Sequence, residues 1–388
     1  MSGLQTILPD SCPRLDIDGL IDDPSVQVIV CCGSGGVGKT TTAASLGLRA
    51  AERGRKVCVL TIDPARRLAQ SMGLTELDNI PRAVAGIDTT TGGSLDAMML
   101  DMKRTFDEIV IAHSEPERAK TVLDNPFYQA MSSSFAGTQE YMAMEKLGQL
   151  RDQAHESGQW DLIIVDTPPS RSALDFLDAP KRLGSFLDGR LMKLLSAPAR
   201  GAGRFGAKVV SAGFSMVTGT LTKIIGAQVL KDLQTFVASF DTLFGGFRAR
   251  AEATYAQLQS PDTRFVVVAA PERDALREAS YFVERLASEN MPLAGLVVNR
   301  VQPVELPQLS VAASIAGADR LDESGEHPLV AGLLRLHADR MKNAERQQHL
   351  TRGFCTAHPR VAVVAVPALA GDVHDLTGLR EIGASLTR

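Results

Sequence analysis

Short, nearly uninterrupted apolar runs recur along the chain, and each ends at a polar or turn-forming residue. Strands that helices cover on both faces are apolar on both sides, so they lack the alternation of half-exposed strands. The pattern therefore predicts an α/β fold with a doubly wound, mostly parallel sheet and helices between the strands. The predicted strands cover residues 26–32, 56–62, 95–100, 161–165, 265–270, 293–298 and 361–366.

The residues that end these strands include candidates for chemistry. In a doubly wound sheet, functional groups gather beyond the carboxyl ends of the strands. Asp63, Asp166, Asn299 and Pro367 each follow or end an apolar run. We therefore expect these four residues to contribute to one site.

The strongest motif directly follows the first predicted strand. The segment from Gly33 to Thr40 satisfies the phosphate-loop pattern G-x-x-x-x-G-K-[ST] and leads into a predicted helix over 42–51. Glycines let backbone N–H groups turn inward around a phosphate, and a helix N-terminus adds partial positive charge. A glycine-rich turn without a ligand is the alternative. The residues expected to bind the nucleotide here are Gly33, Gly35, Gly36, Val37, Gly38, Lys39, Thr40 and Thr41.

Three side chains have candidate roles toward the phosphates. Lys39 can reach the outer phosphates, and the hydroxyl of Thr40 can coordinate Mg²⁺. Asp166 resembles the acidic residue that helps to hold Mg²⁺ in such sites, although an Asp at this position can also cap a helix. The sequence thus predicts ATP and Mg²⁺ as ligands, with Thr40 and Asp166 at the metal.

The other strand-end residues have weaker signals. Asp63 can orient or deprotonate the attacking water, which makes it a candidate catalytic residue together with Lys39. A plain turn residue before Pro64 is the alternative. The amide of Asn299 can pair with a base edge and Pro367 can cover the face of the base, but both residue types are also common in turns.

Composition and charge are those of an ordinary globular protein. Hydrophobic residues make up 44% and charged residues 22% of the 388 residues, and the formal net charge is -4. This charge gives no reason to expect nucleic acid as a partner. We find no secretory-signal layout, and the uncharged stretch 209–222 is too short to cross a bilayer. We therefore expect a cytoplasmic protein.

The five cysteines do not form a metal-binding pattern. None of them belongs to a C-x-x-C pair, which argues against a zinc clasp or an iron–sulfur cluster. Cys31, Cys32 and Cys58 fall within the predicted strands. We therefore expect these three to be small buried hydrophobic residues.

Four segments together resemble one known family. Residues 33–41, 63–65, 135–140 and 166–169 follow the order seen in the arsenical-pump (ArsA) ATPases, which include the guided-entry ATPase that delivers tail-anchored membrane proteins. Asn299 and residues 366–369 resemble the adenine-binding elements of that family. The likeness extends from Val26 to about Leu379. It implies a Mg²⁺-dependent ATPase, with an identical or a paralogous partner in a dimer that nucleotide opens and closes.

The resemblance also implies a domain organisation. The whole chain, 1–388, is expected to be one P-loop ATPase domain with an inserted helical subdomain from about 102–135 and 174–250. The second of these segments has apolar residues at mixed helical spacing and more basic than acidic residues. It is the candidate region for a hydrophobic or membrane-protein client, although its helices can also simply pack on the sheet.

The chain departs from the family at informative positions. Ser34 stands where the family usually has a lysine that reaches the nucleotide of the partner subunit. The consequence is slow hydrolysis, a substitute cation such as Arg66 or Arg67, or a paralogous partner that supplies the lysine. Residues 170–173 lack the usual glycine and histidine, and the arsenite-binding and zinc-binding cysteines have no evident counterparts.

Two further functions compete with an ATPase that handles a client. One is a nucleotide-binding regulatory subunit with little hydrolysis of its own, because Ser34 carries no charge. The other is a chromosome-partitioning or division-site ATPase. That class normally has a basic surface or a terminal membrane-binding helix, and residues 381–388 are too short and too polar for such a helix.

Overall fold

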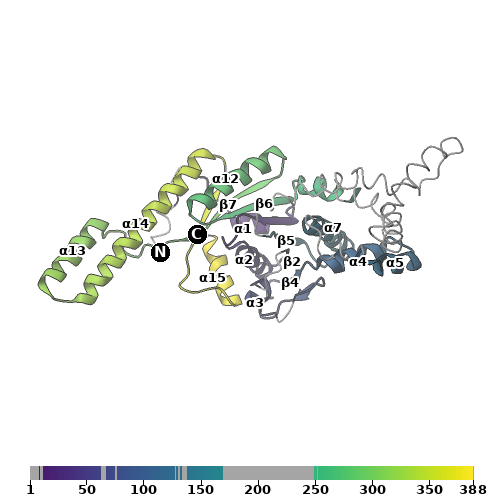
Figure 1. The fold of residues 1–388 in the computed structure, drawn as a ribbon, viewed down its shortest axis with the longest axis horizontal. Coiled ribbons are helices and arrows are strands. Elements are labelled where there is room, and N and C mark those ends of the chain that lie inside the picture. The colour runs from purple at the N-terminus through teal and green to yellow at the C-terminus, as the bar shows by residue number, and fades with distance from the viewer. Residues whose placement is uncertain are drawn as a thin grey trace, which may run out of the picture. The chain divides into compact units, whose positions relative to one another are not determined.

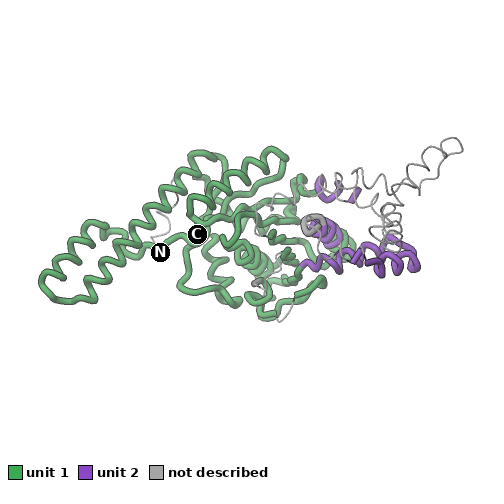
Figure 2. Tube along the Cα trace, in the orientation of Figure 1, with its two compact units in different colours: residues 1–99, 151–174, 257–388 green, residues 100–150, 175–256 purple. Residues whose placement is uncertain are grey.

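The computed structural model describes most of the predicted sheet and its helices. The described residues are 8, 12–62, 67–74, 77–126, 128–129, 132, 138–168, 249–250 and 252–387. They divide into two compact units, one of residues 1–99, 151–174 and 257–388 and the other of residues 100–150 and 175–256 (Figure 2). Asp63, Arg66 and residues 169–173 lie outside the described residues, as does nearly all of the candidate client region.

The described strands form one sheet in the order β3-β4-β2-β5-β1-β6-β7-β8. All neighbouring strands are parallel except β3 and β4. The predicted α/β fold is confirmed, and β3 is a short edge strand that the apolar pattern did not predict. The strands are β1 (Val28–Cys32), β2 (Lys56–Thr61), β3 (Arg82–Ala83), β4 (Ser94–Met99), β5 (Leu162–Asp166), β6 (Thr263–Ala269), β7 (Leu293–Val301) and β8 (Val363–Pro367).

Helices cover both faces of this sheet. The connection from β1 to β2 runs toward one edge of the sheet, and the connection from β6 to β7 runs toward the other. Since such crossovers are right-handed, their helices α2 and α12 cover opposite faces. Every residue of β1 and β5 is buried. The described helices are α1 (Ile17–Asp22), α2 (Lys39–Glu52), α3 (Arg67–Ser71), α4 (Met102–Ala112), α5 (Pro116–Leu123), α7 (Thr138–Ser157), α12 (Arg273–Ser288), α13 (Val311–Ser324), α14 (Pro328–Ala357) and α15 (Leu376–Ser385).

The strand order reverses direction at β1. Because the chain leaves β1 toward β2 while β6 and β7 lie on the other side, the carboxyl end of β1 is the switch point of the sheet. Ligands of doubly wound sheets bind in the crevice at such a point. The helix that follows, α2, packs closely on the sheet, since a Cβ at Gly47 would lie 2.6 Å from Cγ2 of Val59. The fold thus fixes the start of α2 at the switch point.

Helices α13 and α14 form an antiparallel hairpin (Figure 1). A left-handed Gly325 ends α13, and Pro328 begins α14. Leu329, Leu333 and Leu336 lie on one face of α14 and are 76%, 56% and 48% exposed. No described helix has the length and apolar character needed to span a membrane.

The cysteines divide into a bonded pair and three buried thiols. Cys12 and Cys355 form a disulfide whose Cα atoms are 5.8 Å apart, although 343 positions separate them in the sequence. Cys31, Cys32 and Cys58 are buried, as predicted. Burial raises the pKa of Cys32 to about 12 and the pKa of Cys31 well above its ordinary value. These two thiols therefore stay protonated, and unreactive, near neutral pH.

A thiol titration of protein purified without reductant tests this division. We expect three reactive thiols per chain after denaturation, corresponding to Cys31, Cys32 and Cys58, and five once reductant is added. Replacing Cys12→Ser should lower the free energy of unfolding by about 2–4 kcal/mol without reductant, because the cross-link constrains the unfolded chain. With reductant, wild type and variant should unfold alike. Five thiols in the denatured, unreduced protein would contradict the pairing.

Candidate functional site

The loop between β1 and α2 adopts a conformation that only glycine permits at several points. Gly33, Gly36 and Gly38 have φ values of +150°, +76° and +95°. A Cβ at Gly33 would lie 2.1 Å from the carbonyl oxygen of Val268, and one at Gly38 would lie 2.2 Å from Nδ2 of Asn299. The loop is therefore held between β6 and β7 at two points where no side chain fits.

The N-terminus of α2 faces this loop without a side-chain cap. Gly38 is the N-cap residue, and it has no side chain that could accept a hydrogen bond from the first turn of α2. The first N–H groups of a helix lack intrahelical partners and carry partial positive charge. The start of α2 is thus arranged to receive an anion.

Lys39 lies across the loop that it follows. Its side chain is 5% exposed, and its Nζ donates a hydrogen bond to the carbonyl oxygen of Ser34 at 2.8 Å. The ammonium group therefore lies within the curve of the loop, where the outer phosphates of a nucleotide would need a cation.

The predicted metal residues are in direct contact. Thr40 Oγ1 donates to Oδ2 of Asp166 at 2.7 Å, and Asp166 is fully buried at the end of β5. Thr61 Oγ1 donates to the same oxygen at 2.8 Å. The sheet register explains this arrangement, since Thr61 and Asp166 are paired positions of β2 and β5.

Thr61 is a residue of this site that the sequence did not predict. Its only signal is its position as the last residue of β2, two residues before Asp63. Thr167 fixes the chain beyond β5 in a similar way, because its Oγ1 donates to the carbonyl oxygen of Cys31 at 2.9 Å. Hydroxyl groups thus connect the end of β5 to both neighbouring strands: Thr61 connects β2 to Asp166, and Thr167 bonds to Cys31 in β1.

Two adjacent residues of β7 also contact the loop. Asn299 Nδ2 donates to the carbonyl oxygen of Val37 at 2.8 Å, and Arg300 Nη1 donates to the carbonyl oxygen of Gly36 at 3.0 Å. Pro367 ends the neighbouring strand β8, where it pairs with Val301. The structure therefore brings Asn299 and Pro367 to the carboxyl ends of neighbouring strands, and of these two Asn299 contacts the loop. Arg300 is a contact that the sequence did not predict.

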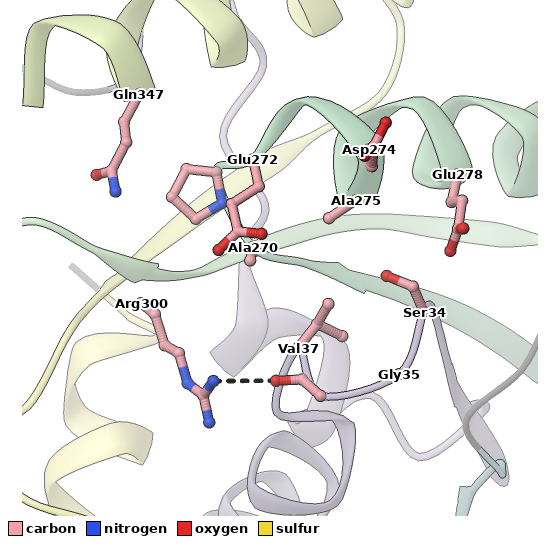
Figure 3. A pocket seen from close by; sticks show the side chains of 12 residues that line it. Ser34, Gly35, Val37, Ala270, Glu272, Asp274, Ala275, Glu278, Arg300 and Gln347 are labelled. Carbon is pink, nitrogen blue, oxygen red and sulfur yellow. Dashed lines mark hydrogen bonds between the residues drawn. The ribbon is translucent and has the colours of Figure 1, made fainter. Parts of the chain in front are cut away.

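A cavity of about 330 Å³ adjoins the outer side of the loop (Figure 3). Residues of the loop form one wall, and the start of α12 forms another. The described lining includes three carboxylates and one cation, Arg300, so the α12 side of this cavity repels phosphate. The lining residues are Ser34, Gly35, Gly36, Val37, Ala270, Pro271, Glu272, Asp274, Ala275, Glu278, Arg300 and Gln347.

Comparisons with known proteins agree with these motifs. The family model of anion-transporting ATPases (ArsA) matches residues 26–313. The chain is 28% identical to ATPase get3 of Schizosaccharomyces pombe over 290 residues, which cover 74% of this chain and 76% of the relative. It is 26% identical to the ATPase ASNA1 homolog of Babesia bovis over 301 residues, covering 76% and 72%. It is also 26% identical to ATPase GET3 of Ajellomyces dermatitidis over 311 residues, covering 78% and 80%.

The family match covers well over half of the chain and includes the loop, Asp166 and Asn299. The resemblance that the sequence motifs indicated is thereby confirmed. The chain belongs to the anion-transporting ATPase (ArsA) family and is an ATP-hydrolysing enzyme.

Proposed function

We propose that this protein hydrolyses ATP with Mg²⁺ at the loop between β1 and α2 and couples this reaction to the opening and closing of a dimer. The observation that carries the proposal is the contact between Thr40 and Asp166, at 2.7 Å, beside a helix start with no side-chain cap. A phosphate on that helix start would lie next to both oxygen ligands.

The loop and Lys39 would bind the phosphates. The backbone N–H groups of residues 35–41 would hold the inner phosphates, and Lys39 would contact the outer ones. The bound triphosphate would replace the carbonyl oxygen of Ser34 as the partner of Nζ. Binding would therefore exchange a hydrogen bond to a neutral oxygen for a stronger one to an anion.

The oxygen atoms of Thr40 and Asp166 would hold Mg²⁺. Mg²⁺ prefers hard oxygen ligands and often takes only one or two from the protein, with phosphates and water completing its shell. One hydroxyl and one carboxylate fit that preference. Thr61 would orient the carboxylate, because it donates to the same oxygen.

The remaining predicted residues complete the proposal. Asp63 would position or deprotonate the attacking water. Asn299 and Pro367 would bind the base, and their common position at the edge formed by β7 and β8 supports this. The motifs shared with the guided-entry ATPases support a hydrophobic or membrane-protein client, bound by an inserted helical subdomain, and a cytoplasmic location.

Ser34 supports a second candidate, a nucleotide-binding subunit that hydrolyses little ATP alone. It contributes a carbonyl oxygen to Lys39 and no positive charge. A charge supplied by a partner subunit can change phosphoryl transfer by several orders of magnitude. A paralogous partner bearing the lysine would then restore turnover.

Replacing Lys39→Ala tests the phosphate site. We expect kcat/KM for ATP to fall by about 100-fold, because a preorganised cation at the transferring phosphate is lost. Lys56→Ala is the matched control, since Lys56 starts β2 at the opposite end of the strand from the loop. Turnover that is equally low in the wild type and in Lys39→Ala, alone and with a partner, would favour the regulatory subunit.

The Thr61→Val variant tests the metal site. This change keeps the side-chain shape but removes the hydroxyl that orients Asp166. We expect the Mg²⁺ concentration for half-maximal ATP turnover to rise about 10-fold. Thr263→Val removes a buried hydroxyl at the amino end of β6 and should not change it. An unchanged Mg²⁺ requirement in a folded Thr61→Val protein would contradict the proposed site.

The Ser34→Lys variant tests the dimer. If two copies of this chain face each other, the new lysine should raise ATP turnover of the purified protein at least 10-fold. Ser34→Gln, which adds length without charge, should not. If neither variant gains turnover while a lysine-bearing paralogue stimulates the wild type, the paralogous pairing is supported. If neither the Ser34→Lys change nor a lysine-bearing paralogue raises turnover, this would count against a cation supplied across the dimer.

A further inference from the structure

The end of β7 departs from regular strand geometry where it meets the loop. Consecutive side chains of a strand point to opposite faces of the sheet. Asn299 and Arg300 are consecutive, yet both donate to the loop. Arg300 has a φ of +61°, and the pairing of β7 with β8 shifts register between Val298 and Val301. The irregular backbone thus turns two neighbouring side chains toward one target.

The two side chains hold consecutive carbonyl groups. Arg300 Nη1 donates to the oxygen of Gly36 at 3.0 Å, and Asn299 Nδ2 donates to the oxygen of Val37 at 2.8 Å. The dashed line in Figure 3 marks the hydrogen bond of Arg300. In a trans peptide, the C=O of one residue and the N–H of the next point in opposite directions. Holding these oxygens toward β7 therefore turns the N–H groups of Val37 and Gly38 away from β7.

Those N–H groups belong to the segment that cradles phosphate in loops of this pattern. We propose that Arg300 is a positioning residue for nucleotide binding: it holds the Gly36 carbonyl so that the N–H of Val37 is oriented before the phosphate arrives. This inference rests on the proposed nucleotide site. It assigns Arg300 to the phosphate loop and not to the base.

Other roles for Arg300 fit the structure less well. No ion pair links it to Glu272, Asp274 or Glu278 among the described residues, although all line the same cavity. A positive φ is unfavourable for an arginine, and such conformations are retained where surrounding contacts compensate for them. The bond to Gly36 is one such contact, and the pairing of β7 with β8 on either side of Arg300 is another. The donor of the bond to Gly36 is also charged, so it polarises the peptide group that it holds.

Calorimetric titration with MgADP and with adenosine tests the proposal. We expect Arg300→Ala to weaken MgADP binding about 10-fold while adenosine binds as to the wild type, because only the phosphate contacts are affected. Arg300→Gly should behave in the same way, and it removes the guanidinium without placing a Cβ at positive φ. Arg264→Ala is the matched control, since Arg264 also donates to carbonyl oxygens but lies in β6 away from the loop.

The outcomes separate the possibilities. MgADP affinity equal to that of the wild type in a folded Arg300→Gly protein overturns the proposal, and so does an equal loss for MgADP and adenosine. If the wild type binds MgADP and Lys39→Ala does not, the nucleotide site stands whatever Arg300→Gly shows. If the folded wild type binds no nucleotide, the proposed function itself fails.

Discussion

The close packing of one loop against two strands constrains the whole site. At two glycines of this loop, a side chain would not fit. Gly33 lies against the backbone of β6, and Gly38 lies against the side chain of Asn299 in β7. The loop therefore cannot move away from the sheet without breaking its contacts with both strands. Since α2 begins at Lys39 and packs on β2 through Gly47, the loop, the helix start and the sheet are packed together as one support. The loop is therefore preorganised, since its contacts with the two strands already give it this conformation.

Two sets of hydrogen bonds lie on either side of this loop. On the β5 side, Thr40 and Thr61 donate to one carboxylate oxygen of Asp166. On the β7 side, Asn299 and Arg300 donate to two carbonyl oxygens of the loop. In the proposed site, the first group would present oxygen ligands for a cation, and the second would turn N–H groups toward an anion. The ATPase chemistry of the family needs both at the same edge of the sheet.

The sequence predicts those parts of the protein that short-range patterns determine. Apolar runs located the main strands, and the glycine motif located the loop, because both depend on neighbouring residues. Thr61 and Arg300 could not be predicted in this way. The role of Thr61 depends on strand register, and that of Arg300 depends on the sign of its φ angle. The disulfide between Cys12 and Cys355 joins distant positions and has no local signal. The order of strands was likewise set by tertiary packing, while Asp63 stays a prediction outside the described residues.

A crystal structure of the chain with Mg²⁺ and a nonhydrolysable ATP analogue tests the central claim most directly. We expect a phosphate within hydrogen-bond distance of the N–H groups of residues 36–40, and Mg²⁺ bound to Oγ1 of Thr40. Nζ of Lys39 should have left the carbonyl of Ser34 for a phosphate oxygen. A nucleotide bound elsewhere, with Lys39 still on Ser34 and the loop unoccupied, would contradict the claim.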